Sequence, residues 1–290
     1  MTTILPRPFT WVAAPPTPFG SGRCSLPCSG EIFIWRLDLP SLPLEPLLQL
    51  LTDAERRGEK EGRRYRTDFA FWLKARAALR GILSAFTGQP GSQIAIAAGG
   101  GQKPALTNNP HGLHFSVSRS KDYALIVLGR APLGIDIEAV RPGFSWHTIA
   151  THWFHPREQA RLAATPEGQR IETFFQIWTQ KEAFFKGLGI GLDRESMTSC
   201  FVAPDGRLIR DCQGPPLQAW RLQALSAPSG YKAALASIGR PHIVVQRMVA
   251  LERGELRQPP GERPHAIMKQ DDLETCTRSG APQQEVVHGL

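Results

Sequence analysis

Apolar residues between positions 171 and 185 recur with the period of an α-helix. They fall at i, i+3, i+4, i+7 and i+14, and they are Ile171, Phe174, Phe175, Trp178 and Phe185. At about 100° per residue these positions share one arc of the helix surface, which predicts a helix with a buried face. Glu182 lies in the middle of that arc, and Lys186 follows one turn later.

Two explanations for the position of Glu182 are open at this point. The side chain is either at the edge of the core, where it reaches water or pairs with a lysine, or it is a ligand or catalyst at the floor of a cleft. The second explanation follows from the cost of burying an unpaired carboxylate. The choice depends on which other residues of the chain meet Glu182.

Alternating and helical patterns extend over most of the chain. Alternation predicts strands at 31–39, 93–97, 114–118, 123–129, 133–140, 217–225 and 231–239, and a hairpin at 201–210. Apolar stripes and caps predict helices at about 50–62 and 66–87, and a helical region at 145–187 that is broken near HPRE and TPEG. This order predicts an α+β fold that is compatible with two similar halves, although no sequence repeat demonstrates a duplication.

The two ends of the chain differ in composition from its centre. Residues 1–30 are rich in Pro, Gly and Ser, which predicts a loose leader. Residues 241–290 begin with an apolar stretch and then become polar, so we expect most of this tail to be disordered or loosely docked. No apolar run approaches the roughly 20 residues of a membrane helix, and the N-terminus is a poor signal peptide. Five cysteines without zinc-type spacing are expected to be free thiols, which predicts a cytoplasmic protein.

The charge of the chain is unevenly distributed. The net charge is +8, and residues 241–290 contribute −1, so the remaining 240 residues carry +9. An excess of positive charge indicates an anionic partner, which is a nucleic acid, a phosphorylated cofactor or an acidic protein. A generally basic proteome would produce the same charge, so composition does not choose among these explanations.

Two carboxylates lie two residues apart in the predicted strand GIDIE at 134–138. Side chains two apart share one face of a strand, so Asp136 and Glu138 are expected to lie together on the face opposite the core. Neighbouring carboxylates repel one another, and Mg²⁺ held by a few carboxylates together with water and phosphate oxygens is a common compensation. A solvated strand face with two acids is the alternative. If Glu182 approaches from its helix, three carboxylates converge.

Basic and hydroxyl side chains form a further group of candidates. Lys103 precedes a proline in the glycine-rich loop GQKPAL, Ser118 and Arg119 end a predicted strand, and Arg76 lies on the predicted helix at 66–87. Such residues bind phosphate by charge and by forked hydrogen bonds. Taken singly, each is also expected on an ordinary protein surface, and the group gains meaning only beside a metal site.

Five segments occur in the order that is typical of the Sfp-type 4′-phosphopantetheinyl transferases, and together they resemble that family. They are QKPAL at 102–106, FSVSRS at 115–120, GIDIE at 134–138, FHPRE at 154–158 and WTQKEAFFK at 178–186. The resemblance covers about 31–240. It implies a phosphopantetheinyl transferase-like α+β fold of two similar α/β halves packed as a pseudo-dimer. The halves are expected at 31–130 and 131–240, the second with the metal and coenzyme A site.

The resemblance also implies roles for individual residues. The residues implied as Mg²⁺ ligands on the pyrophosphate of coenzyme A are Asp136, Glu138 and Glu182. The residues implied at the nucleotide end are Lys103, Ser118, Arg119 and Arg76. Lys186 is implied to contact the phosphate and to assist departure of the leaving group, and Glu158 to have a supporting structural role. Arg119 stands where the family usually has histidine, and because arginine binds phosphate well we expect binding to survive.

The implied reaction joins a carrier-protein serine to the phosphopantetheine arm of coenzyme A and releases adenosine 3′,5′-bisphosphate. Glu182 is the expected base for the serine proton, and Lys186 is expected to stabilise charge on the leaving group. An acidic carrier protein fits the basic body of the chain, and we expect a monomer with no nucleic-acid or membrane partner. The alternatives are another Mg²⁺-dependent phosphoryl or nucleotidyl transferase, a non-catalytic basic module that binds nucleic acid, and an inactive relative of the same fold.

Overall fold

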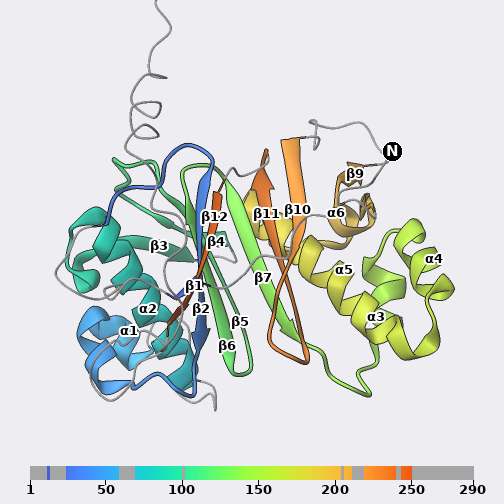
Figure 1. Cartoon of the computed structure of the whole chain (residues 1–290), viewed down its shortest axis with the longest axis horizontal. Coiled ribbons are helices and arrows are strands. Elements are labelled where there is room, and N and C mark those ends of the chain that lie inside the picture. The colour runs from blue at the N-terminus through green and yellow to red at the C-terminus, as the bar shows by residue number, and fades with distance from the viewer. Residues whose placement is uncertain are drawn as a thin grey trace, which may run out of the picture. The chain divides into compact units, whose positions relative to one another are not determined.

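The computed structural model describes residues 12–13, 24–58, 69–99, 102–203, 206–210, 219–239 and 243–249. The strands are β1 (Val12–Ala13), β2 (Glu31–Asp38), β3 (Ile96–Gly99), β4 (Gln102–Leu106), β5 (His114–Ser120), β6 (Tyr123–Gly129), β7 (Leu133–Ala139), β8 (Cys200–Val202), β9 (Leu208–Arg210), β10 (Trp220–Leu225), β11 (Tyr231–Ile238) and β12 (Ile243–Val249). The α-helices are α1 (Asp53–Arg57), α2 (Phe69–Thr87), α3 (Trp146–Trp153), α4 (Pro156–Ala164), α5 (Glu167–Leu188) and α6 (Arg194–Thr198). Among the described residues, the 3₁₀ helix η1 (Glu45–Leu50) precedes α1 and the 3₁₀ helix η3 (Gly91–Gln93) precedes β3. Figure 1 shows the arrangement of the helices and strands.

The order of the elements repeats once along the described part of the chain. The first series is β2, α2, the hairpin β3–β4, β5 and β6, and the second is β7, α5, the hairpin β8–β9, β10 and β11. In both series the last strand lies between the other two long strands, which gives the sheet orders β2–β6–β5 and β7–β11–β10. β12 and β1 extend the first sheet beyond β2. The predicted α+β fold with two similar halves is confirmed, and the similarity lies in topology.

Two sheets and two long helices form successive layers (Figure 1). α2 packs on one face of the first sheet, where Leu79 and Ile126 belong to one buried cluster. The other face of this sheet packs against the second sheet through residues such as Ile34 and Ile135. α5 covers the outer face of the second sheet, to which it contributes Phe184. Burial of apolar side chains in all three interfaces is the main favourable contribution to this arrangement.

α5 is buried on more than one side, which differs from the single stripe predicted by its sequence. Phe174 and Phe175, in its first half, pack with Phe154 and Leu162 in the cluster formed with α3 and α4. Phe185, in its second half, packs toward the second sheet. The periodicity therefore located a real helix, but its apolar residues serve two different interfaces.

Most of the predicted elements are present. Thr52 caps α1 in a capping box with Glu55, and α3, α4 and α5 are separated at the predicted breaks. Lys103 lies in strand β4, paired with β3, and not in the predicted glycine-rich loop. Part of the predicted tail, Ile243–Val249, pairs in parallel with β2, while most of the leader and all of 250–290 lie outside the described residues. None of the helices in the described ranges has the length and apolar character needed to cross a membrane.

Candidate active site

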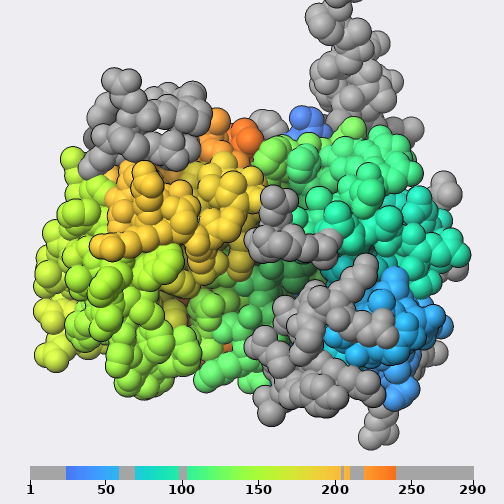
Figure 2. Space-filling model, turned by 180° about the vertical axis from the view of Figure 1, so that it is seen from behind, coloured from blue at the N-terminus to red at the C-terminus, as the bar shows by residue number. Residues whose placement is uncertain are grey.

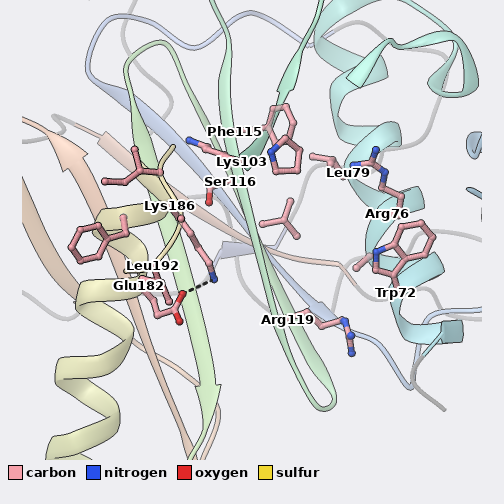
Figure 3. A pocket seen from close by; sticks show the side chains of 16 residues that line it. Trp72, Arg76, Leu79, Lys103, Phe115, Ser116, Arg119, Glu182, Lys186 and Leu192 are labelled. Atoms are coloured by element: carbon pink, nitrogen blue, oxygen red, sulfur yellow. Dashed lines mark ion pairs between the residues drawn. The ribbon is translucent and has the colours of Figure 1, made fainter. Parts of the chain in front are cut away.

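A cleft of about 490 Å³ lies between the two long helices. Its lining includes Trp72, Arg76 and Leu79 of α2, Lys103 of β4, Phe115 and Arg119 of β5, Glu182 and Lys186 of α5, and the loop 190–192. Figure 3 shows the side chains of α5 on one side of the cleft and those of α2 on the other. In the space-filling view of Figure 2, yellow atoms of the α5 region and teal atoms of the α2 region flank a receding green surface. The cleft therefore collects residues from both topological halves.

The GIDIE segment lies in β7, which is an edge strand of the second sheet. Ile135 and Ile137 are fully buried between the two sheets, and Asp136 on the opposite face contacts Lys186 of α5. The alternation predicted from the sequence is therefore confirmed. Asp136 is only 1% exposed, and its Oδ2 atom is buried with no hydrogen-bond partner among the described residues. A buried carboxylate oxygen in this condition is costly, and a cation is one means of satisfying it.

Two glycines allow α5 to approach the second sheet closely. A Cβ atom on Gly134 of β7 would lie 2.0 Å from the carbonyl oxygen of Ala183 on α5. A Cβ atom on Gly187 of α5 would lie 2.6 Å from the ring of Trp220. Neither position has space for a side chain, so glycine is required at both. The close approach brings the last turns of α5, which carry the predicted catalytic residues, onto the carboxylates of β7.

Lys186 lies among the carboxylates of the site. Its Nζ atom is 2.6 Å from Oδ1 of Asp136. It is also 3.7 Å from Oε2 of Glu182, the ion pair drawn as a dashed line in Figure 3. Burial raises the pKa of Glu182 to about 7; the charge of Lys186 opposes this rise, and Asp136 and Glu138 add to it. Burial and the charge of Asp136 also raise the pKa of Glu138. A carboxylate that titrates near neutral pH is suited to accept and release a proton.

The ammonium of Lys186 is stabilised by its neighbours. Desolvation by itself would lower the pKa of Lys186, but the charges of Asp136, Glu182 and Glu138 raise it. The predicted i,i+4 pair of Glu182 and Lys186 is thus part of a larger charged cluster. Glu182 pairs with Lys186, as the first explanation expected, and it also lines the cleft, which is the position that the second explanation required.

The three carboxylates predicted as metal ligands do not form a closed cage. Within the described ranges, no group of three or more His, Cys, Asp and Glu side chains is arranged to hold a metal ion. Lys186 acts as the counter-ion of Asp136 and Glu182, because like charges at close range repel without a compensating cation. The residues nevertheless fit Mg²⁺, which binds through one or two carboxylates together with water and phosphate oxygens. The buried Oδ2 atom of Asp136 is a suitable oxygen ligand.

The predicted phosphate-binding cations Arg76, Lys103 and Arg119 all line the cleft. Nε of Arg76 is 2.5 Å from Oε1 of Glu55, so its charge is shared with an acid. Lys103 donates to the carbonyl oxygen of Leu133 at 2.7 Å, and burial lowers its pKa to about 8. Figure 3 shows Arg119 at one end of the group and Lys103 at the other. The cleft is thus lined by several cations, which favours a ligand with more than one anionic group.

Ser118, also predicted at the nucleotide end, has a different environment. It is 6% exposed and lies against the carboxylate of β7. Its hydroxyl donates to Oδ1 of Asp136 at 2.6 Å and accepts a hydrogen bond from Nζ of Lys186 at 3.2 Å. These contacts orient Asp136 and Lys186 relative to each other.

Glu158 has the structural environment that was expected of it. Its side chain is 1% exposed and lies 2.7 Å from Nζ of Lys181, which is fully buried in α5. Oε1 of Glu158 also accepts from the N–H of Val202, and Oε2 accepts from the N–H of His155. The FHPRE glutamate therefore connects α4, α5 and β8, and it lies outside the cleft lining.

Several contacts that position the site were not predicted from the sequence. Ser120 donates to Oε2 of Glu138 at 2.8 Å. Glu55 of α1 pairs with Arg76 and also with Arg80, which is 3% exposed. The Ser-x-Ser-x-Ser alternation of β5 was a sequence signal for the contact between Ser120 and Glu138. For Glu55, the sequence indicated only a place in the helix cap and not its pairing with the two arginines.

Comparison with known proteins identifies related sequences. A model of the 4′-phosphopantetheinyl transferase superfamily matches residues 132–236, which contain β7 and α5. The 4′-phosphopantetheinyl transferase HetI of Nostoc sp. is 29% identical over 236 residues, which are 79% of this chain and 94% of HetI. The 4′-phosphopantetheinyl transferase AcpT of Salmonella typhimurium is 34% identical over 145 residues, which are 50% of this chain and 71% of AcpT. A holo-(acyl-carrier-protein) synthase from Bacillus anthracis, crystallised in complex with CoA, is 20% identical with a TM-score of 0.31, over 37% of this chain and 95% of the synthase.

Proposed function

The chain belongs to the 4′-phosphopantetheinyl transferase superfamily, and on this premise we propose that it transfers the 4′-phosphopantetheine arm of coenzyme A to a serine of an apo carrier protein. The serine Oγ atom forms a bond to the phosphorus of the arm, the bond from that phosphorus to the bridging oxygen breaks, and adenosine 3′,5′-bisphosphate leaves. The observation that carries the proposal is the cleft in which the Lys186 ammonium lies between two carboxylates, opposite further cations.

Coenzyme A would bind through its phosphates. Lys103, Arg119 and Arg76 line one cleft and match the residues that the family resemblance implies at the nucleotide end. Arginine contributes positive charge and a forked donor geometry that matches phosphate, so Arg119 would serve as a phosphate ligand. Burial lowers the pKa of Lys103 to about 8. A bound phosphate would raise that pKa again, because an opposite charge favours the ammonium form.

Glu182 is the proposed base. Its carboxylate lines the cleft one turn from Lys186, where it would take the proton of the carrier serine as the oxygen attacks phosphorus. Lys186, one helical turn further along, neutralises charge on the leaving bisphosphate. Asp136 and Ser118 hold the Lys186 ammonium in place, so the charge is positioned before substrate binds. Phosphoryl transfer depends on positioning and charge neutralisation, which this arrangement supplies.

Asp136, Glu138 and Glu182 are the carboxylates proposed to hold Mg²⁺, which would bind through one or two of them together with water and phosphate oxygens. When bound, the ion supplies positive charge to the pyrophosphate oxygens. Support comes from the buried Oδ2 atom of Asp136, which has no hydrogen-bond partner among the described residues, and from the crowding of the carboxylates: burial first, and then the neighbouring acids, raise the pKa values of Glu138 and Glu182.

The proposed partner is an acidic carrier protein, in keeping with the basic body of the chain. A monomer is the proposed working state, because residues from both halves of one chain line the same cleft. Coenzyme A as donor distinguishes this reaction from other Mg²⁺-dependent phosphoryl or nucleotidyl transfers.

Intact-protein mass spectrometry of an apo acyl carrier protein tests the proposal. Incubation with the protein, coenzyme A and Mg²⁺ is expected to add the mass of one phosphopantetheine arm, and EDTA is expected to abolish the gain. Carrier proteins of the fatty-acid, polyketide and peptide-synthetase types cover the possible partners. No gain on any of them, together with no coenzyme A binding by calorimetry, would refute the proposal.

A further inference from the structure

A ladder of serine hydroxyls joins the two sheets beside the candidate active site. β5 and β7 are edge strands of separate sheets, and no main-chain ladder connects them among the described residues. Instead, backbone N–H groups of β7 donate to hydroxyls of β5: Ile135 to Ser116 at 3.3 Å, Ile137 to Ser118 at 3.3 Å and Ala139 to Ser120 at 3.1 Å. An edge strand otherwise leaves such donors without partners, which is costly when they are buried.

Two of the three serines also hold a carboxylate. A hydroxyl has one proton to donate and two lone pairs to accept. Ser118 donates to Asp136 at 2.6 Å, and Ser120 donates to Oε2 of Glu138 at 2.8 Å. Each hydroxyl thus bonds both to the β7 backbone and to the acidic side chain one residue earlier. At Ser116 the corresponding β7 residue is Gly134, which has no side chain to hold.

We propose that Ser120 is a positioning residue that orients Glu138 for the cation of the proposed transfer reaction. The inference rests on the proposed function. Glu138 has a flexible side chain, and the charge of Asp136 on the same strand face repels it. The Ser120 hydroxyl is tied to the backbone of the very strand that carries Glu138, so it fixes one carboxylate oxygen relative to that strand. Outer partners of this kind typically change metal affinity or activity by about 10- to 100-fold when they are removed.

Calorimetric titration of Mg²⁺ into the protein with coenzyme A present tests this role. Ser120→Ala is expected to weaken Mg²⁺ binding by about 10- to 100-fold. Ser120→Thr, which keeps the hydroxyl, is expected to restore most of the affinity. Coenzyme A affinity measured without Mg²⁺ is expected to be unchanged in Ser120→Ala. If Ser120→Ala does not fold, Ser120→Cys is measured in its place. The thiol is a weaker donor than the hydroxyl, so a smaller loss of Mg²⁺ affinity is expected.

Ser116→Ala is the matched control. It removes the same kind of hydrogen bond to the β7 backbone, but Gly134 provides no carboxylate to orient. Both alanine variants are therefore expected to lower the thermal unfolding midpoint to a similar extent, and only Ser120→Ala is expected to change the Mg²⁺ dissociation constant. A merely structural role for Ser120 would make the two variants behave alike.

A double-mutant cycle with Glu138→Gln completes the test. Because Ser120 acts through Glu138, adding Ser120→Ala to Glu138→Gln is expected to weaken Mg²⁺ binding no further. Three outcomes would overturn the inference and leave the proposed function standing. They are additive effects of the two substitutions, equal Mg²⁺ binding by Ser120→Ala and the wild type, and weaker coenzyme A binding by Ser120→Ala in the absence of metal. Transfer by the wild type that needs no divalent cation would overturn the inference together with the metal site.

Discussion

Replacement of Lys181 by methionine is predicted to destabilise the protein by about 3–5 kcal/mol. Nζ of Lys181 is completely buried and donates at 2.7 Å both to Oε2 of Glu158 and to the carbonyl oxygen of Cys200. Methionine has a similar length, so the loss comes mainly from the Glu158 carboxylate. It stays buried and, within the described part of the chain, keeps the N–H groups of His155 and Val202 as its hydrogen-bond partners. For a domain of this size, about 2–4 °C of thermal midpoint is lost per kcal/mol, so the midpoint is expected to fall by roughly 10 °C.

Urea denaturation and differential scanning calorimetry measure this loss. Lys232→Met is the control. Lys232 of β11 pairs at 3.0 Å with Glu172 of α5, the helix that also carries Lys181, but the Glu172 side chain is 61% exposed. Removing that surface pair is expected to cost at most about 1 kcal/mol. The double variant Lys181→Met/Glu158→Gln is expected to be more stable than Lys181→Met, since it removes the isolated charge. A loss in Lys181→Met no larger than that in Lys232→Met would refute the reasoning.

Three further predictions concern the cleft, the helix–sheet contact and the acid side of the stability profile. Glu182→Gln keeps the shape of the side chain but cannot accept a proton, so carrier modification followed by mass spectrometry is expected to fall about 10²–10⁴-fold with the fold retained; near-normal transfer would exclude Glu182 as the base. Gly134→Ala places a Cβ atom 2.0 Å from the Ala183 carbonyl and is expected to prevent folding or to lower the thermal midpoint severely, whereas Gly168→Ala, with open space around it, is expected to have little effect. The pKa of Glu55 is lowered to about 2: burial opposes this shift, but hydrogen bonds and charges from two arginines of α2 outweigh it. The ionised Glu55 carboxylate therefore stabilises the folded state fully above its unfolded pKa, and this contribution is lost as the pH falls from about 4.5 toward about 2. Urea titrations across this range are expected to show a loss on the order of 1 kcal/mol in the free energy of unfolding, after allowance for solvent screening. Glu55→Gln should remove this pH dependence.

Local patterns in the sequence were sufficient for much of the fold and for part of the site. The alternation of GIDIE placed Asp136 and Glu138 on one strand face because a strand turns its side chains to opposite faces at every residue. The breaks at HPRE and TPEG separated α3, α4 and α5 because proline begins a helix but cannot continue one. The helical period also placed Glu182 and Lys186 one turn apart. Lys103 was misplaced in a loop, since the glycines before it concealed a short strand that pairs with β3.

The contacts between elements were decided by the tertiary structure alone. No local pattern indicated that Lys181 would be buried against Glu158, since a lysine on a helix normally faces water. The packing of the two sheets and α5 also decides the serine ladder between β5 and β7. It likewise places Lys186 among the carboxylates, in place of a preformed cation cage. The physical reason is one of range. Backbone geometry repeats every two or 3.6 residues and is encoded locally, whereas burial and charge interactions act between residues that only the folded chain brings together.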